Sequence, residues 1–591
     1  MSWILSNRWI ARGSERLFDP PAWLWDQAGD VGWWVRSDWH RSLIGDQGLC
    51  LDEWRRQGRL HVVKKGPHRV VYRVELPEGP VYVKHYLVPG LRAKVRQWFR
   101  RGKGRNEWRR TRYLHAIGIP TVTPIALGEQ RKGKLLFENY LVTPEIPGSV
   151  PLDEFVEHRL PEWPARRRTR MRQELAESLA VLTAKLHDAG FVHQDFHPGN
   201  ILVRIGDDDR PSLAMIDLDA LRVAPHLSWS DAGKNLALLN HYFWLRSDRA
   251  DRSRFLRHYL SARQSDAPDP RLFARQIEQA TRAWAERLWR RWGRRCLGTN
   301  KYFKKFRGDQ AWSVAARSLD RSEVRSLLAD PDAPFRREGT VILKDSRTTT
   351  VAETTMMVDG LPARVIYKRF NRKKWLDPLL TWFRPSRAWQ SWQAAQHLVS
   401  RALPTPANLA FIARLRPFWR DPLFWYLPHE TYLVTIKAEP AVVLGSYVRN
   451  IMPSLDPDVR RVCTRRLTLS LARLLRTLHE RSLSDRDLKT ANIMILGDPM
   501  ADAPELSIID LVGVRLAHPL PHHRRVQNLA RLSLSLENVP GRTRSDSLRF
   551  LRTYLPWGLS PHNDWKGLWR DVESCIHQKV GRNQRKGRVI S

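Results

Sequence analysis

Two short polar segments of the chain carry residue types that phosphoryl transfer requires. In HQDFHPGN, Asp195 lies five positions before Asn200. In DRDLKTAN, Asp487 lies five positions before Asn492. At this spacing in a tight loop, the carboxylate can accept the proton of an attacking hydroxyl while the amide binds a metal ion. We therefore expect Asp195 and Asp487 to be catalytic bases, although this spacing alone identifies no chemistry.

A second aspartate follows each segment after an apolar run. Asp217 lies in MIDLDALRV, and Asp510 lies in IIDLVGVRL. An aspartate at the end of a strand can chelate Mg²⁺, which neutralises charge between the β- and γ-phosphates of ATP. The expected metal ligands are Asn200, Asp217, Asn492 and Asp510.

A lysine that holds the α- and β-phosphates is expected upstream of each loop. Lys84 ends the alternating segment VYVKHY, and Glu107, on a predicted helix, can pair with it. Lys368 in VIYKRF is the corresponding lysine of the second set, but Ser391 stands where Glu107 has its counterpart. Lys489 follows the second expected base by two residues and can neutralise the γ-phosphate. The expected nucleotide-binding residues are Lys84, Glu107, Lys368 and Lys489.

The two sets belong to an internal repeat. YLVT at residues 140–143 recurs at residues 432–435, and KNLALL at 234–239 corresponds to QNLARL at 527–532. Leucines at helical spacing precede both polar segments with the same offset, and each stripe predicts one buried helix face. The stripes are Leu175, Leu179, Leu182 and Leu186, and Leu467, Leu471, Leu474 and Leu478. The chain is therefore predicted to be a duplicated domain.

The length and the ordered motifs together predict the architecture. A chain of 591 residues is too long for one hydrophobic core. We expect an α+β protein with two tandem bilobal protein-kinase-like domains, each with a small β-rich N-lobe and a larger helical C-lobe. The expected division is a Trp-rich N-terminal extension at residues 1–45, a first domain at 46–290 and a second at 291–591.

The motifs resemble those of a known family. HQDFHPGNILV followed by MIDLDALRV is similar to the catalytic and metal loops of lipopolysaccharide kinases of the Kdo/WaaP type, in the protein-kinase-like superfamily. GIPTVTPIALGE at residues 118–129 is also similar, as is IIDLVGVRL with RRVQNLARL in the second copy. The resemblance implies ATP and Mg²⁺ as cofactors. It also implies phosphoryl transfer to a sugar hydroxyl of the lipid A–inner core glycolipid at the cytoplasmic membrane.

Charge suggests a membrane-surface location. Lys and Arg number 100 against 61 Asp and Glu, a net charge of +39. Basic, aromatic segments follow both phosphate lysines, at residues 91–110 and 368–392, and could dock on an anionic leaflet. The sequence shows no signal peptide, no spanning segment and no nucleic-acid-binding motif beyond charge. We expect a cytoplasmic protein peripheral to the inner face of the membrane, with no specific nucleic-acid partner.

Other readings stay open. DRDLK resembles the catalytic loop of Ser/Thr protein kinases, which makes protein kinase activity an alternative. Because the second copy lacks the helix glutamate, a second alternative is an active first kinase domain followed by a regulatory pseudokinase domain. Neither copy has a proper glycine-rich loop: KKGPHR at residues 64–69 has one glycine and KDSRTT at 344–349 has none. A non-catalytic scaffold would explain the charge but has no need of a repeated Lys/Asp/Asn/Asp set.

Overall fold

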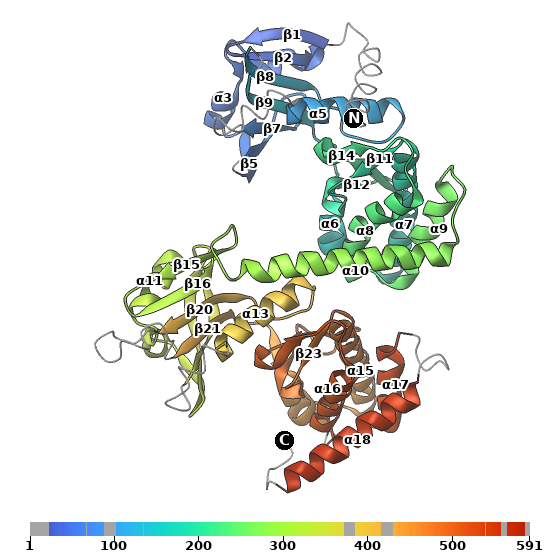
Figure 1. Cartoon of the computed structure of the whole chain (residues 1–591). Coiled ribbons are helices and arrows are strands. Elements are labelled where there is room, and N and C mark those ends of the chain that lie inside the picture. The colour runs from blue at the N-terminus through green and yellow to red at the C-terminus, as the bar shows by residue number, and fades with distance from the viewer. Residues whose placement is uncertain are drawn as a thin grey trace. The chain divides into compact units, whose positions relative to one another are not determined.

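The computed structural model describes residues 23–66, 68–87, 102–133, 135–371, 385–414, 430–537, 539, 541–556 and 564–585. The chain divides into two compact units, residues 1–286 and 287–591. Each unit has a sheet-rich N-lobe and a helix-rich C-lobe (Figure 1). The division falls inside helix α10 (Pro270–Arg295), which also contains the boundary expected at residues 290–291. The predicted tandem α+β, kinase-like architecture is confirmed.

The first N-lobe is a seven-stranded sheet in the order β1-β2-β8-β9-β7-β6-β5, antiparallel throughout. Its strands are β1 (Trp23–Ala28), β2 (Val31–Arg36), β5 (Leu60–Lys65), β6 (Arg69–Val74), β7 (Val81–Leu87), β8 (Ala126–Lys132) and β9 (Leu135–Pro144). The elements between β2 and β5 are α2 (His40–Leu43), β3 (Ile44–Gly45), β4 (Gly48–Leu49) and α3 (Leu51–Arg56). Helix α5 (Lys103–Ala116) packs against β9, β7 and β8. Alternate residues of β7, such as Val81 and Val83, are fully buried, as the period of a strand requires.

Part of the expected N-terminal extension belongs to this sheet. Strand β2 pairs with β8, and Trp33 and Val35 on it are buried in the same core as Trp54. A Cβ at Gly128 would lie 2.5 Å from the Trp33 ring, so the strand opposite must carry a glycine here. The described part of residues 1–45 therefore forms one side of the first N-lobe instead of a separate segment, because its tryptophans bury against the sheet.

The first C-lobe is built around helix α7. Its helices are α6 (Leu152–Glu154), α7 (Ala165–Asp188), α8 (Trp229–Arg246), α9 (Arg249–Ala262) and α10. Two small sheets, β10-β12-β13 and β11-β14, carry the polar loops. Their strands are β10 (Val150–Pro151), β11 (Phe191–His193), β12 (Ile201–Ile205), β13 (Pro211–Met215) and β14 (Leu221–Val223).

The second N-lobe repeats the first sheet. Its order is β15-β16-β20-β21-β19-β18-β17, and α13 (Arg387–Ser400) takes the place of α5. The strands are β15 (Phe303–Arg307), β16 (Ala311–Ala316), β17 (Val341–Ser346), β18 (Thr349–Val358), β19 (Leu361–Phe370), β20 (Asn408–Arg414) and β21 (Thr431–Ile436). Between β16 and β17 lie α11 (Arg321–Ala329) and the short helix η7 (Ala333–Arg336). Asp359 and Gly360 join β18 to β19 with φ values of +49° and +77°, the left-handed pair of a tight two-residue hairpin.

The second C-lobe repeats the first around helix α15. Its helices are α14 (Leu444–Ser446), α15 (Pro457–Glu480), α16 (His522–Ser535), α17 (Arg544–Tyr554) and α18 (Trp565–Gln584). Its strands are β22 (Ala441–Val443), β23 (Leu483–Asp485), β24 (Ile493–Leu496), β25 (Glu505–Ile508) and β26 (Val514–Leu516). Both predicted leucine stripes are buried, on α7 and α15 respectively, each in the core of its own C-lobe. The predicted helix faces are therefore confirmed.

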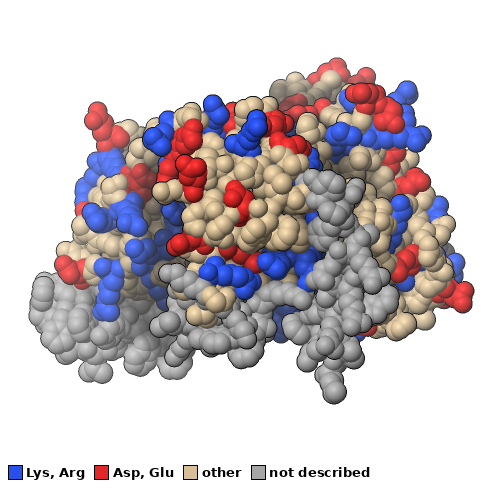
Figure 2. Space-filling view, turned by 90° about the horizontal axis from the view of Figure 1, so that it is seen from above, with Lys and Arg blue, Asp and Glu red and all other residues tan. Residues whose placement is uncertain are grey.

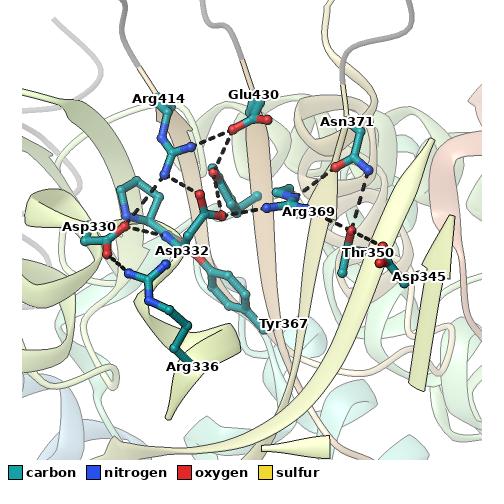
Figure 3. A network of polar contacts seen from close by, with 12 residues as sticks. Asp330, Asp332, Arg336, Asp345, Thr350, Tyr367, Arg369, Asn371, Arg414 and Glu430 are labelled. Carbon is teal, nitrogen blue, oxygen red and sulfur yellow. Dashed lines mark hydrogen bonds and ion pairs between the residues drawn. The ribbon is translucent and has the colours of Figure 1, made fainter. Parts of the chain in front are cut away.

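A charged network covers the back of the second sheet (Figure 3). Residues on β19 alternate in direction, so Arg369 points away from the face that carries Lys368. The Asp332 carboxylate accepts hydrogen bonds from Arg369 at 3.0 Å, Arg414 at 2.6 Å and the Tyr432 hydroxyl at 3.1 Å. Burial alone would raise the pKa of Asp332, but the two arginines outweigh it and lower that pKa. The network ties the loop before η7 to three strands, and thereby holds the sheet in place from behind.

The surface does not separate charge into large single-sign regions in the view of Figure 2, where Lys and Arg are interspersed with Asp and Glu. Within the described ranges, none of the helices has the length and apolarity needed to cross a bilayer. Of the two expected docking segments, residues 91–101 and 372–384 lie outside the described residues. Trp389 and Trp392 of the second segment are packing residues: Trp389 contacts the Phe411 ring, and Trp392 is fully buried.

Candidate active sites of the two units

The first site is organised by an ion pair between strand β7 and helix α5. Lys84 Nζ lies 2.5 Å from Glu107 Oε1, and the Tyr86 hydroxyl donates to Glu107 Oε2 at 2.6 Å. Glu107 is only 3% exposed, so both of its oxygens need these partners. Burial, together with the Glu107 charge, raises the pKa of Tyr86 well above its usual value, so this hydroxyl keeps its proton. The structure thus brings together the lysine and the glutamate that the sequence paired.

Residues 193–200 form the expected catalytic loop of the first unit, called the catalytic loop below, and the loop places Asp195 and Asn200 side by side. Asn200 Nδ2 donates to the Asp195 carbonyl oxygen at 2.8 Å, which closes the loop across the short helix η5 (Pro198–Asn200). His193 is fully buried beneath it: its Nδ1 accepts from the Asp195 backbone N–H, and its Nε2 lies 3.3 Å from the Asp217 carbonyl oxygen. His193 therefore connects the two loops structurally, while the Asp195 carboxylate remains exposed.

His197 is a neighbour of the expected base. Its Nδ1 accepts from the Gly199 N–H, which leaves Nε2 facing Asp195 Oδ2 at 3.6 Å. The polar contact with His197 lowers the pKa of Asp195, and the same contact raises the pKa of His197. Asp195 is therefore held as a carboxylate, the form that can accept a proton.

Asp217 has a strained backbone and a positively charged environment. Its φ is +58°, a left-handed conformation that aspartate tolerates better than most residues, and helix η6 (Leu218–Ala220) starts directly after it. Burial would raise the pKa of Asp217, but the charges of Lys84 and Arg69 lower it. Arg69 Nη1 lies 3.1 Å and 3.2 Å from the two carboxylate oxygens. The sequence did not single out Arg69, because its partner is 148 residues away.

A buried triad supports each catalytic loop and was not recognised from sequence. His187 on α7 bonds to Asn235 Oδ1 at 3.1 Å and to the Tyr259 hydroxyl at 2.8 Å. Asn235 Nδ2 donates to the His193 carbonyl oxygen at 2.7 Å, and its Oδ1 accepts from the His193 N–H. Burial lowers the pKa of His187 to about 4, so it is neutral near pH 7.

The second unit repeats this triad with His479, Asn528 and Tyr554. Asn528 bonds to both backbone polar groups of Asp485, at 2.9 Å and 3.1 Å, and His479 bonds to Asn528 and Tyr554. The signal was present in the repeated Leu-His and in the asparagine shared by KNLALL and QNLARL. Only the folded structure shows that these asparagines bond to the catalytic loops.

The second site differs where the helix glutamate is missing. Ser391 on α13 is buried, and Lys368 Nζ instead lies 2.8 Å from Asp510 Oδ1. Asp510 has φ +55°, matching Asp217. Lys368, Asp510 and Ser391 are among the lining of a cleft of about 930 Å³, large enough for a small-molecule ligand. The expected phosphate lysine of this unit, Lys368, is thus paired with the expected metal ligand itself.

The second catalytic loop carries more positive charge than the first. Asn492 Nδ2 donates to the Asp487 carbonyl oxygen at 2.8 Å, as in the first unit. Lys489 Nζ lies 3.3 Å from Asp487 Oδ2, and Arg531 Nη1 lies 3.8 Å from Oδ1. Lys489 therefore contacts the expected base in this structure.

Asp485 occupies the place that His193 has in the first unit. It is fully buried; Oδ1 accepts from the Asp487 N–H at 2.9 Å, while Oδ2 has no hydrogen-bond partner among the described residues. A Cβ at residue 513 would lie 2.1 Å from Oδ1, so Gly513 makes room for this carboxylate. Burial first, and then the charges of Asp487 and Asp510, raise the pKa of Asp485 to about 6.

The donor set of the first unit fits a nucleotide with Mg²⁺. Because the Asn200 amide nitrogen bonds to Asp195, the amide oxygen is left for a cation, and Asp217 supplies a carboxylate. Magnesium commonly takes one or two carboxylates, with phosphate oxygens and waters completing its shell. The described residues contain no cluster of three or more His, Cys, Asp and Glu that could hold a metal by itself. The set therefore suits a metal that arrives with phosphate.

Comparison with known proteins gives a consistent result. The sequence model of the lipopolysaccharide kinase (Kdo/WaaP) family matches residues 53–259 and, again, residues 347–554. The lipopolysaccharide core heptose(I) kinase WaaP of Pseudomonas aeruginosa is 30% identical over 165 residues, which cover 26% of this chain and 59% of that protein. WaaP of Escherichia coli is 22% identical over 173 residues, which cover 27% of this chain and 61% of that protein.

These matches thus span 59% and 61% of the length of the curated relatives. Among solved structures, WaaP in complex with acyl carrier protein aligns with 45% of this chain and 97% of its own, at 22% identity and a TM-score of 0.32.

The raised pKa of Asp485 predicts how the stability of the second unit depends on pH. A carboxyl whose pKa is about 6 when folded and near 3.8 when unfolded binds more protons in the folded state, so stability falls as pH rises from about 4 to about 6. Asp485→Asn removes this loss and should stabilise the second unit at pH 7.5 by up to about 3 kcal/mol, but much less at pH 4. Calorimetry of the full chain at the two pH values measures the difference.

The exposed carboxylate Asp502 supplies the matched control. Asp502→Asn should leave the pH dependence of unfolding unchanged. Equal destabilisation by Asp485→Asn at both pH values would contradict this prediction. It would mean that the folded state needs the Asp485 carboxylate in its ionised form.

Proposed function

Because the chain belongs to the lipopolysaccharide kinase (Kdo/WaaP) family, we propose that it is an ATP-dependent kinase acting on a sugar hydroxyl of the lipopolysaccharide core, with the first unit as the working site. The observation that carries the proposal is the buried Lys84–Glu107 ion pair, in the same unit as the closed Asp195–Asn200 loop and Asp217. Relatives named as heptose(I) kinases favour a heptose hydroxyl over a Kdo hydroxyl as the first acceptor to test.

Each residue then has one role. Lys84, oriented by Glu107, binds the α- and β-phosphates of ATP. Asp195 orients the acceptor hydroxyl and accepts its proton, which its lowered pKa allows. Asn200 and Asp217 would hold Mg²⁺, which would supply positive charge beside the phosphates. His193 and the His187–Asn235 contact keep the loop in this conformation.

The second unit is proposed as the weaker or regulatory site. Without a helix glutamate, Lys368 pairs with Asp510, so the expected phosphate lysine must itself leave the expected metal ligand before it can bind phosphate. The Lys489–Asp487 contact and the DRDLK sequence favour a second candidate, protein kinase activity in this unit. Phosphorylation of a Ser or Thr by the full chain, lost on Asp487→Asn but kept on Asp195→Asn, would support that candidate.

Peripheral attachment to the inner face of the cytoplasmic membrane is part of the proposal. The net charge of +39 supports attraction to an anionic leaflet. The full chain should sediment with vesicles that contain anionic lipid at low salt, and high salt should release it because the attraction is screened. Neutral vesicles serve as the control. Absence of binding to anionic vesicles at low salt would contradict this location.

The two units can be separated by single substitutions. Transfer of ³²P from ATP to extracted lipopolysaccharide should fall by about 100-fold or more on Asp195→Asn, because the base for the acceptor hydroxyl is removed. Asp487→Asn should retain most of the transfer. Asp208→Asn, an exposed carboxylate in the first unit, is the matched control and should behave as wild type. Loss of transfer on Asp487→Asn alone would assign the chemistry to the second unit instead.

A further inference from the structure

The β5–β6 hairpin of the first unit replaces glycine with basic side chains. In protein kinases a glycine-rich loop covers the nucleotide phosphates through its backbone. Here the described part of the hairpin has one glycine, Gly66. Lys64 and Arg69 lie on the face of the sheet that carries Lys84, whereas Lys65 lies on the other face. Positive charge from Lys64 also contributes to lowering the pKa of Asp195, after the larger effect of the contact with His197, so the hairpin lies near the catalytic loop.

Arg69 points into the site because of its register. Arg69 on β6 lies opposite Tyr86 on β7, and Val71 lies opposite Lys84, so all four side chains share one face of the sheet. The Arg69 guanidinium is partly buried, about 6.0 Å from the centre of the Tyr86 ring, and it contacts both oxygens of Asp217.

A divalent cation could take the place of the Arg69 guanidinium beside Asp217. A guanidinium satisfies a carboxylate through charge and N–H donors, and a divalent cation satisfies the same carboxylate more strongly. Phosphate oxygens offer the guanidinium an equivalent partner, since the planar fork fits phosphate as well as carboxylate. When a metal takes Asp217, Arg69 therefore remains on the cleft face with its donors available.

The second unit lacks this arginine. Thr349 lies opposite Phe370 on the neighbouring strand, as Arg69 lies opposite Tyr86, and Lys368 itself contacts Asp510. In the first unit Lys84 pairs with Glu107, and Asp217 accepts its side-chain hydrogen bonds from Arg69. The arginine and the helix glutamate thus occur together in one unit and are both absent from the corresponding positions of the other.

We propose that Arg69 is a phosphate-binding residue of the first site that exchanges partners. It pairs with Asp217 before the nucleotide binds, and it donates to the nucleotide phosphates once Mg²⁺ occupies Asp217. This inference rests on the proposed function of the first unit. In it, the Arg69 side chain binds the nucleotide phosphates, which in protein kinases are bound by backbone amides of the glycine-rich loop.

The test uses the full chain and two binding measurements with opposite expected signs. Arg69→Met should weaken binding of a non-hydrolysable ATP analogue with Mg²⁺, measured by calorimetry, by roughly tenfold to a hundredfold through loss of a charge-assisted contact. The same variant should bind Mn²⁺ alone more tightly, measured by electron paramagnetic resonance, because no arginine competes for Asp217. The second unit is identical in every variant, so the differences report on the first site.

Controls separate binding from folding. Lys65→Met removes a charge from the neighbouring position of the hairpin, whose side chain points to the other face, and should change neither measurement. Arg69→Lys should fall between wild type and Arg69→Met for the nucleotide. Unchanged values for Arg69→Met, or a loss of both nucleotide and Mn²⁺ binding, would overturn the inference while the kinase proposal stands. A wild-type chain that binds no nucleotide would overturn both.

Discussion

The ion pair between Lys84 and Glu107 is the interaction on which the first site depends. It joins a sheet strand to the helix packed on that sheet, and burial makes each charge require the other. With the pair formed, Lys84 Nζ has Glu107 as its hydrogen-bond partner instead of Asp217, the expected metal ligand. The second unit shows the consequence of losing the glutamate: Ser391 leaves Lys368 with Asp510 as its partner. Two differences therefore separate the units at this point: Ser391 stands in place of Glu107, and Thr349 stands in place of Arg69.

The support beneath the two sites is shared even though their charges differ. In both units a buried histidine bonds to an asparagine that holds the backbone of the catalytic loop, with distances that agree within 0.3 Å. Both copies have therefore kept the buried contacts that support the loop, while the side chains on the loop differ. His193 in the first unit and Asp485 in the second are the clearest case. His193 joins two loops, whereas Asp485 has one carboxyl oxygen with no hydrogen-bond partner within the described part of the chain.

Features that repeat or have a period could be predicted from the sequence. The leucine stripes, the repeat of YLVT and the order of Lys84, Asp195 and Asp217 could be read from the sequence. Contacts between distant residues could not be predicted, and Arg69 is the example, because nothing near it in the sequence indicates that it meets Asp217. The location of the tryptophans could not be predicted either. A high tryptophan content is typical of proteins at a membrane surface, but Trp33 and Trp392 are buried in the cores of the two N-lobes.

The central claim is that the first unit holds its phosphate lysine ready for a nucleotide and the second does not. An acyl-phosphate derivative of ATP tests this directly, because it acylates the lysine beside the bound phosphates and mass spectrometry then locates the modified residue. The account predicts labelling of Lys84 that excess ATP prevents, with much weaker labelling of Lys368. Preferential, ATP-sensitive labelling of Lys368 with Lys84 unmodified would contradict it.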